Sequence, residues 1–221
     1  RYMRQTRGSG RAAARNQGIL AASGEIVLLL NADVRLPKDF LHRLSEHYQS
    51  GIDYLLVESE ISNTKHLLPR YLQSQHMFYY GEQLQQINMN WTEGFSCRRT
   101  AAIDVGLVPE GQVVPLVAGE DGWFGERLQE YGYRKLFDRE VLVEHIAPKH
   151  LREFLEQRVG RGHGVGQIWV IRNGISQRRL VWQAIGHTVI RVIATVAVVP
   201  MLWHAWRYAN YSPLGWRDFV P

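Results

Sequence analysis

Two pairs of polar side chains in this sequence have the types and spacing that chemistry requires. Asn31 and Asp33 lie two residues apart and directly follow an apolar run. Glu120 and Asp121 are adjacent and follow Gly119. Oxygen-bearing side chains such as the first pair bind hard cations, and a carboxylate such as those of the second pair can take a proton as a general base. The sequence thus offers a candidate cation site and a candidate base.

The element expected to position the first pair is a buried strand. Residues 25–30 contain an unbroken apolar run, which is typical of a central strand covered on both faces. Residues 11–22 are rich in alanine and predict a helix that packs closely on the sheet. Ligands of open α/β sheets bind beyond the carboxyl ends of such strands. Since residues i and i+2 of an extended segment point the same way, we expect Asn31 and Asp33 to converge on one cation.

The second pair is expected at the start of a helix whose apolar face includes Trp123, Phe124 and Leu128. The positive end of a helix stabilises ionised carboxylates in its first turn, so Asp121 is expected to be ionised. Each pair also has a purely structural interpretation. An Asn or Asp after a strand is common in turns, and acidic residues before an apolar helix are a common cap. Taken singly, neither motif decides between these interpretations.

The composition is that of a folded domain. The chain has 221 residues, of which 45% are apolar and 21% are charged, as in ordinary globular proteins. Its one cysteine, Cys97, excludes an intrachain disulfide framework and favours a reducing compartment. A net charge of +5 favours an anionic partner, namely a nucleotide diphosphate, an anionic lipid or nucleic acid.

Taken together, the motifs resemble a known enzyme family. The pattern G-x-x-x-A-R-N-x-G at residues 10–18, the apolar strand, Asn31-Ala32-Asp33 and Gly119-Glu120-Asp121 are similar to the inverting GT-A glycosyltransferases of family 2. The resemblance extends over residues 7–164. In that family a D-x-D motif ends a strand and binds Mg²⁺ or Mn²⁺ on the diphosphate of a nucleotide-sugar. Asn31 replaces the first aspartate here, so the resemblance implies Asp33 as the main metal ligand.

The resemblance also implies roles for further residues. Asp121 would be the general base, and Glu120 would orient the acceptor or Asp121. His145, at the end of an expected strand, would either complete the metal site with Asp33 and Asn31 or face the pyrophosphate of the donor. The residues implied in donor binding are Arg15, Asn16, Asn31, Asp33, Arg158 and Arg161.

The implied fold class is α/β, a GT-A-like mixed sheet flanked by helices. We expect this domain at residues 1–165, lacking the family's first βα units, and a helical tail at residues 166–221. Within the domain, helices are expected at residues 37–48, 67–84 and 149–164, the second of them interrupted at Pro69, and strands are expected at residues 53–57, 134–137 and 141–143.

Residues 180–206 form the most apolar part of the tail. Arg191 and Pro200 interrupt this segment, which leaves too short a run for a confident membrane span. Tryptophans near both of its ends suit a membrane interface, and arginines before it suit an anionic cytoplasmic surface. We therefore expect a re-entrant or interfacial membrane helix that holds the protein, peripherally or integrally, on the cytoplasmic face of the cell membrane. A core helix is the alternative.

The expected function is metal-dependent, inverting transfer of a sugar from a nucleotide-sugar donor to a glycan or lipid-linked acceptor, in polysaccharide or glycolipid synthesis. The resemblance favours the donor and a membrane surface, and not nucleic acid, as the anionic partners. Two alternatives remain. One is a nucleotidyltransferase, which shares the sheet and an aspartate at a strand end. The other is a degenerate or partner-dependent GT-A module that acts as a membrane-proximal scaffold in glycan assembly.

Overall fold

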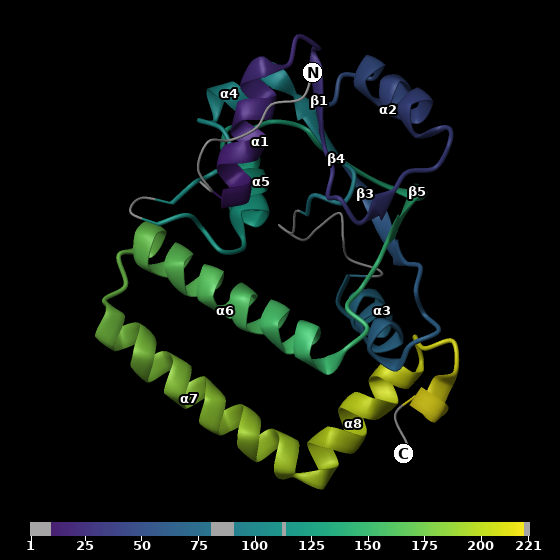
Figure 1. The fold of residues 1–221 in the computed structure, drawn as a ribbon, viewed down its shortest axis with the longest axis vertical. Helices are drawn as coiled ribbons and strands as arrows, with labels where there is room; N and C mark the ends of the chain where they lie inside the picture. The colour runs from purple at the N-terminus through teal and green to yellow at the C-terminus, as the bar shows by residue number, and fades with distance from the viewer. Residues whose placement is uncertain (1–9, 81–90, 112–113, 219–221) are drawn as a thin grey trace.

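The computed structural model describes residues 10–80, 91–111 and 114–218. Its centre is a mixed sheet with the strand order β1-β4-β3-β5-β2 (Figure 1). The strands are β1 (Ile26–Leu29), β2 (Val34–Arg35), β3 (Tyr54–Ile61), β4 (Phe95–Arg98) and β5 (Lys135–His145). β3 pairs parallel with β5 and antiparallel with β4, which in turn pairs antiparallel with β1. β1, β3 and β5 therefore run in the same direction, and their carboxyl ends lie at the same end of the sheet. The expected α/β class is confirmed.

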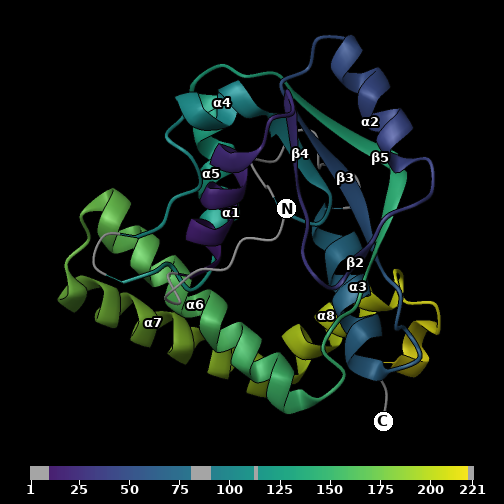
Figure 2. The same ribbon diagram turned by 45° about the horizontal axis from the view of Figure 1, so that its top comes forward.

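Helices cover both faces of this sheet (Figure 1, Figure 2). α1 (Gly10–Ala21), α4 (Arg99–Asp104) and α5 (Glu120–Glu130) lie on one face, and α2 (Phe40–Gln49) lies on the other. The first face contributes Val27 and Leu29 of β1 to a core that includes Phe124 of α5. On the second face, Ile26 and Leu28 pack against the core built around α2.

The expectation that β1 is a central strand is wrong for the described residues, because β1 lies at the edge of the sheet and pairs with β4. Its unbroken apolar sequence has another cause. Helices cover the sheet on both sides, so successive residues of an edge strand also face apolar cores. An apolar run thus indicates coverage of both faces and does not fix the position of the strand within the sheet.

The remaining elements of the domain differ from expectation mainly in length. α2 begins three residues after Pro37, and β3 continues four residues past Val57. α3 (Leu67–Tyr80) has a proline in its first turn, where proline is tolerated, so the expected interruption is absent from the described helix. Its expected continuation to residue 84 lies outside the described residues, as do residues 7–9, with which the family resemblance begins. Two expected strands form the single strand β5, which contains a register shift opposite Val57 and Glu58.

The chain after the sheet forms α6 (Leu151–Asn173), α7 (Gln177–Val196), α8 (Val198–Ala209) and the short 3-10 helix η1 (Gly215–Asp218). α6 runs nine residues beyond its expected end and crosses the expected domain boundary at residue 165. Residues 180–206 were expected as one helix but form parts of two. Pro200 explains the break, because in a continuous helix its ring would clash with the carbonyl of Val196. Val196 is the residue at which α7 ends. Among the helices of the described residues, none is long and apolar enough to cross a membrane.

α6 continues through its glycines because one of them is a packing site. A Cβ atom at Gly164 would lie 2.2 Å from the carbonyl oxygen of Ala118. Gln167, less than one turn further, donates to the carbonyl of Pro115 and accepts from the N–H of Val117. The helix therefore supports the loop that leads into α5, which begins at Glu120.

Candidate active site

Asp33 and His145 meet where β5 ends and shortly after β1 ends. β2 begins directly after Asp33 and pairs with β5 in a register that sets Val34 opposite His145. This pairing brings Nε2 of His145 to 3.2 Å from Oδ2 of Asp33. The Asp33 side chain is 51% exposed, so a ligand from solvent can reach the pair. Two residues from distant parts of the sequence are thus brought together, as expected.

Asn31 forms its hydrogen bonds with residues outside that pair. Its Oδ1 accepts hydrogen bonds from Nη2 of Arg15 at 3.0 Å and from the hydroxyl of Thr92 at 3.1 Å. Residues 32–33 form a turn, so the extended geometry behind the expected convergence of Asn31 and Asp33 is absent there, and their convergence on one cation stays a prediction. The i and i+2 rule holds only in extended segments. In the described part of the chain, no group of three His, Cys, Asp or Glu side chains could hold a metal ion.

Arg15 joins this strand end to the start of α5. Its Nη1 lies 2.9 Å from Oε1 of Glu120, and its Nη2 donates to Asn31 and to Thr92. The Glu120 side chain is 2% exposed and also contacts Arg11, whose Nε lies 3.2 Å from Oε1. Burial of a carboxylate is costly unless it is paired, and the two arginines supply that pairing. The two motifs of the sequence therefore form one polar cluster.

Asp121 follows in the first turn of α5 and is partly buried. Gly119 precedes the helix in the left-handed conformation, with φ 86°. Burial and then the charge of Glu120 raise the pKa of Asp121 to about 6, although its Oδ1 accepts from the N–H of Gly122. Desolvation thus outweighs the stabilisation of the ionised form that was expected from the helix terminus. Asp121 is still mostly ionised at neutral pH, as a general base must be.

Comparison with known proteins identifies the first half of the chain. Residues 1–110 match the family model described as glycosyl transferase family 2. The chain carries a glycosyl transferase family 2 domain. The glycosyltransferase prediction made from the sequence is thereby supported by the family. Glu120, Asp121 and His145 lie beyond the segment matched by the family 2 model.

Relatives of this family 2 domain extend over more of the chain. The catalytic subunit of a UDP-forming cellulose synthase from Dictyostelium discoideum is 29% identical over 171 residues, which are 73% of this chain and 16% of that protein. Glycosyltransferase AglE from Haloferax volcanii is 29% identical over 174 residues, 77% of this chain and 55% of that protein. The chain thus spans about half or less of the length of these curated relatives.

A solved structure supports the fold. The mannosyltransferase PcManGT from Pyrobaculum calidifontis, in complex with GDP-Man and Mn²⁺, superposes with a TM-score of 0.51 at 18% identity, covering 79% of this chain and 48% of that one. At this identity the likeness concerns the fold, and it supports a GT-A-like arrangement of the family 2 domain.

Asn16 does not lie in the polar cluster of the family 2 domain. Its amide is 5% exposed; it donates to the carbonyl of Val108 and to Glu110, and it accepts from the N–H of Val108. These bonds hold the segment after α4 against α1. The structure thus gives Asn16 a structural role between α1 and the segment after α4, and its expected role in donor binding stays a prediction.

Arg158 and Arg161 lie on α6. Nη2 of Arg158 donates to Gln75 of α3 at 2.7 Å, and its guanidinium lies 4.9 Å from the ring centroid of Phe154. Arg161 is exposed. Arg158 thus packs α6 on α3, and the donor-binding role expected for both arginines stays a prediction.

Two members of the cluster, Arg11 and Thr92, were not predicted from the sequence. Arg11 lies one helical turn before Arg15, so helical spacing could have placed both on one face. Thr92 lies in a loop without periodic pattern, and the sequence holds no signal for its contact with Asn31.

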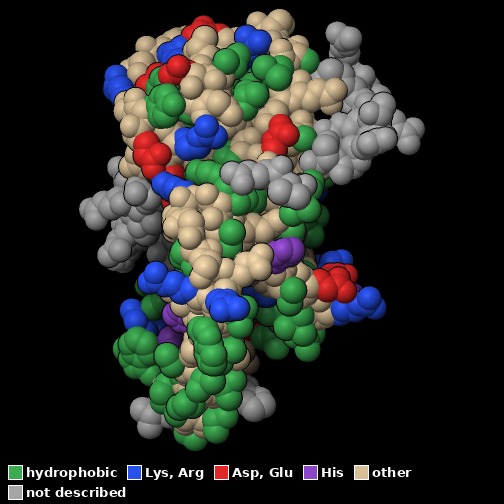
Figure 3. Space-filling view, turned by 90° about the vertical axis from the view of Figure 1, so that its left-hand side faces the viewer, with side chains coloured by type: hydrophobic (Ala, Val, Ile, Leu, Met, Phe, Trp, Pro, Cys, Tyr) green, Lys and Arg blue, Asp and Glu red, His purple; other side chains and the backbone are tan. Residues whose placement is uncertain are grey.

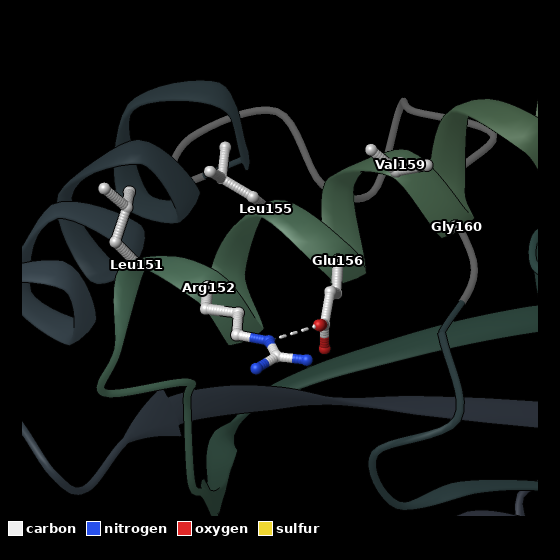
Figure 4. Close-up of a pocket in the computed structure, with 6 residues that line it drawn as sticks. All are labelled: Leu151, Arg152, Leu155, Glu156, Val159 and Gly160. Carbon is white, nitrogen blue, oxygen red and sulfur yellow. Dashed lines mark hydrogen bonds and ion pairs between the residues drawn. The ribbon is translucent and has the colours of Figure 1, made fainter.

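A separate groove of about 660 Å³ lies along α6. It is lined by Leu151, Arg152, Leu155, Glu156, Val159 and Gly160. Figure 4 shows that the three large apolar side chains point to the side opposite the Arg152–Glu156 ion pair. None of the predicted site residues lines this groove, so it is not the place of the expected chemistry.

Proposed function

We propose that this protein transfers a sugar from a nucleotide-sugar donor to an acceptor hydroxyl with inversion, using Asp121 as general base and a divalent cation at Asp33. One observation carries the proposal. A single guanidinium, that of Arg15, bonds both to Asn31 at the end of β1 and to Glu120 beside Asp121. Because of this link, the end of β1, with Asp33 close behind, and the carboxylate with a pKa of about 6 belong to one site.

The Asp33–His145 pair fits a divalent cation. It supplies a carboxylate oxygen and an imidazole nitrogen 3.2 Å apart, with the carboxylate half exposed. Oxygen and imidazole donors suit Mn²⁺ and related ions, and diphosphate oxygens of the donor would add further ligands. When bound, the cation offsets the charge of the departing nucleotide diphosphate. The Mn²⁺ of the mannosyltransferase neighbour supports this assignment.

Asp121 supplies the proton acceptor. As the acceptor hydroxyl attacks the anomeric carbon from the face opposite the diphosphate, its proton passes to the Asp121 carboxylate. A new carbon–oxygen bond to the acceptor forms while the bond to the diphosphate oxygen breaks. Attack from the opposite face inverts the anomeric configuration, and one protein carboxylate is sufficient for it. The acceptor class we propose is a glycan or a lipid-linked sugar.

We expect Mn²⁺-dependent release of nucleotide diphosphate that disappears in Asp33→Ala. The test incubates the protein with UDP- and GDP-sugars, with and without Mn²⁺, and with glycan or lipid-linked acceptors. Nuclear magnetic resonance of the product reports the anomeric configuration. Calorimetry should show that Asp33→Ala loses the Mn²⁺-dependent part of the donor affinity, because the main carboxylate ligand is gone.

Asp39→Ala is the matched control, since Asp39 is an exposed carboxylate that pairs with Arg43 of α2. It should leave donor affinity unchanged. Unchanged Mn²⁺-dependent affinity in Asp33→Ala would remove Asp33 from the site. Donor binding without any turnover would favour the scaffold alternative.

We further propose that α7 and α8 place the protein on the cytoplasmic face of a membrane. After α6, from residue 174 to the end, the sequence has five arginines, no lysine and one acidic residue, so this segment carries +4 of the net charge of +5. Large apolar side chains of α7 and α8 are exposed, among them Trp182, Ile193 and Trp203. Figure 3 shows hydrophobic side chains gathered at the end of the molecule formed by these helices, with basic side chains above them. Apolar area combined with positive charge suits anionic lipid surfaces.

Vesicle sedimentation should detect this attachment. The protein should sediment with vesicles that contain phosphatidylglycerol and less with pure phosphatidylcholine, and salt should weaken the binding. Ile193→Asp, on α7, should reduce sedimentation because its side chain is 63% exposed. Leu41→Asp on α2, 66% exposed, is the matched control and should sediment normally. Equal sedimentation of both variants would show that the exposed apolar side chains of α7 do not bind the membrane.

A further inference from the structure

The contacts of Arg15 go beyond those of a donor-binding residue. Its guanidinium bonds at once to Glu120 on α5, to Asn31 after β1 and to Thr92 before β4, at 2.9, 3.0 and 2.9 Å. The Arg15 side chain is 14% exposed, and that of Glu120 is 2% exposed. These bonds are therefore formed inside the protein, where hydrogen-bonded charges hold geometry most firmly.

We propose that Arg15 is a positioning residue, which fixes the start of α5 at the end of β1 through its simultaneous bonds to Glu120 and Asn31. This inference rests on the proposed function, in which Asp121 is the base. Asp121 is covalently next to Glu120, so fixing Glu120 fixes the direction of the neighbouring carboxylate. Reacting groups need this precision, because a displacement of about 1 Å can cost 10²-fold in rate.

The role requires arginine in particular. The planar guanidinium presents several N–H groups in a fixed fork, whereas a lysine ammonium is a compact point charge on a flexible stem. Lysine at position 15 would keep the charge but not the bridge between Glu120 and Asn31. Arg11, whose side chain is 60% exposed, also contacts Glu120. Because of this contact, Glu120 keeps one charged partner when Arg15 is replaced. The variants are therefore expected to fold.

The charges around Asp121 give a second way to detect Arg15. The charged groups that act on its carboxylate are Glu120 and Glu93, which raise the pKa, and Arg15, which lowers it. Removing the charge of Arg15 should therefore raise the pKa of Asp121 further. Neutralising Glu120 should lower that pKa. If the two substitutions only destabilised the fold, they would not shift the pKa of Asp121 in opposite directions.

The experiment compares Arg15→Lys, Arg15→Gln and Glu120→Gln in the full chain. Arg15→Lys should lower kcat about tenfold or more, with a much smaller change in donor affinity. Nuclear magnetic resonance titration of protein carrying ¹³C-labelled aspartate carboxyls, with the Asp121 signal identified by its loss in Asp121→Asn, should show a higher titration midpoint in Arg15→Gln and a lower one in Glu120→Gln. Arg99→Lys is the control, because Arg99 bonds to the carboxyl end of α1 through Ile19 and Leu20.

Two results would overturn the proposal. One is a kcat of Arg15→Lys equal to that of Arg99→Lys. The other is an Asp121 titration in Arg15→Gln identical to that of the unmodified protein. The titration needs no sugar transfer, so failure of the proposed function and failure of the role of Arg15 are distinguishable. Should Arg15→Gln not fold by circular dichroism, the kinetic comparison with Arg15→Lys decides.

Discussion

Replacing Asp121 with asparagine should slow sugar transfer by about 10²–10⁴-fold, the usual cost of losing a general base, and at the same time stabilise the fold. Asparagine keeps the shape of the side chain and can still accept from the N–H of Gly122. It cannot accept the proton of the acceptor hydroxyl. Donor affinity in the presence of Mn²⁺ should change little, because Asp33 is untouched.

The gain in stability follows from the pKa of Asp121. The folded state raises this pKa from 3.8 to about 6, so the native protein binds this proton more tightly than the unfolded chain does. The ionised group therefore costs no stability below pH 3.8, and its full cost is present above about pH 6. A shift of this size corresponds to at most about 3 kcal/mol, and we expect about 1–2 kcal/mol for this partly buried group.

Urea denaturation at pH 4 and pH 7.5 measures this cost. The free energy of unfolding of Asp121→Asn should exceed that of the unmodified protein at pH 7.5, and the difference should shrink at pH 4. The kcat of the unmodified protein should fall below about pH 6 as Asp121 takes up a proton. A variant that transfers sugar at the normal rate would show that the base lies elsewhere and that Gly119-Glu120-Asp121 is a helix cap.

Gly164→Ala should damage both stability and transfer, although alanine is normally the better residue in a helix. The added Cβ would lie 2.2 Å from the oxygen, 2.6 Å from the nitrogen and 2.7 Å from the carbonyl carbon of Ala118. These are backbone atoms, so either α6 or the loop before α5 must move. We expect a loss of about 1–3 kcal/mol or more in the free energy of unfolding and a slower transfer, because this loop leads directly to Glu120 and Asp121.

Gly162→Ala is the matched control in the same helix. Nothing lies within 4 Å of a Cβ at Gly162, so this variant should gain about 0.5–1 kcal/mol from its lower unfolded-state entropy. Thermal unfolding and the initial rate of nucleotide diphosphate release are measured for both variants. If Gly164→Ala and Gly162→Ala had equal unfolding temperatures and equal initial rates, the contact of α6 with Ala118 would not position α5.

The sequence predicted those parts of the fold that depend on local pattern. The helix before β1, the helix that begins at Glu120 and the strand end at His145 follow from periodicity and helix signals. The edge position of β1 could not be predicted, because an apolar run reports coverage of the faces and not pairing at the edges. The length of α6 could not be predicted either, since the packing of Gly164 on Ala118 overrides the helix-breaking tendency of its glycines.

The sequence indicated candidate residues for the site, but it did not predict how they are arranged in space. Asp33, His145, Glu120 and Asp121 were selected by type and position, and their roles stay predictions. Residues 32–33 form a turn, and the amide oxygen of Asn31 accepts a hydrogen bond from Arg15, a contact that the sequence did not predict. The raised pKa of Asp121 depends on burial by distant segments, which the local sequence does not contain.

The contacts of the candidate site also bear on when the site forms. Arg15 and Glu120 are separated by 105 positions along the chain, and Asp33 and His145 by 112. Closing such long loops costs conformational entropy before the contacts that they bring together can form. Contacts between residues so far apart in the sequence therefore slow folding. Local helices can form early, whereas the polar cluster requires that both ends of the domain have already met. Partly folded chains, during synthesis or after thermal damage, therefore contain α1 and α5 without an assembled site.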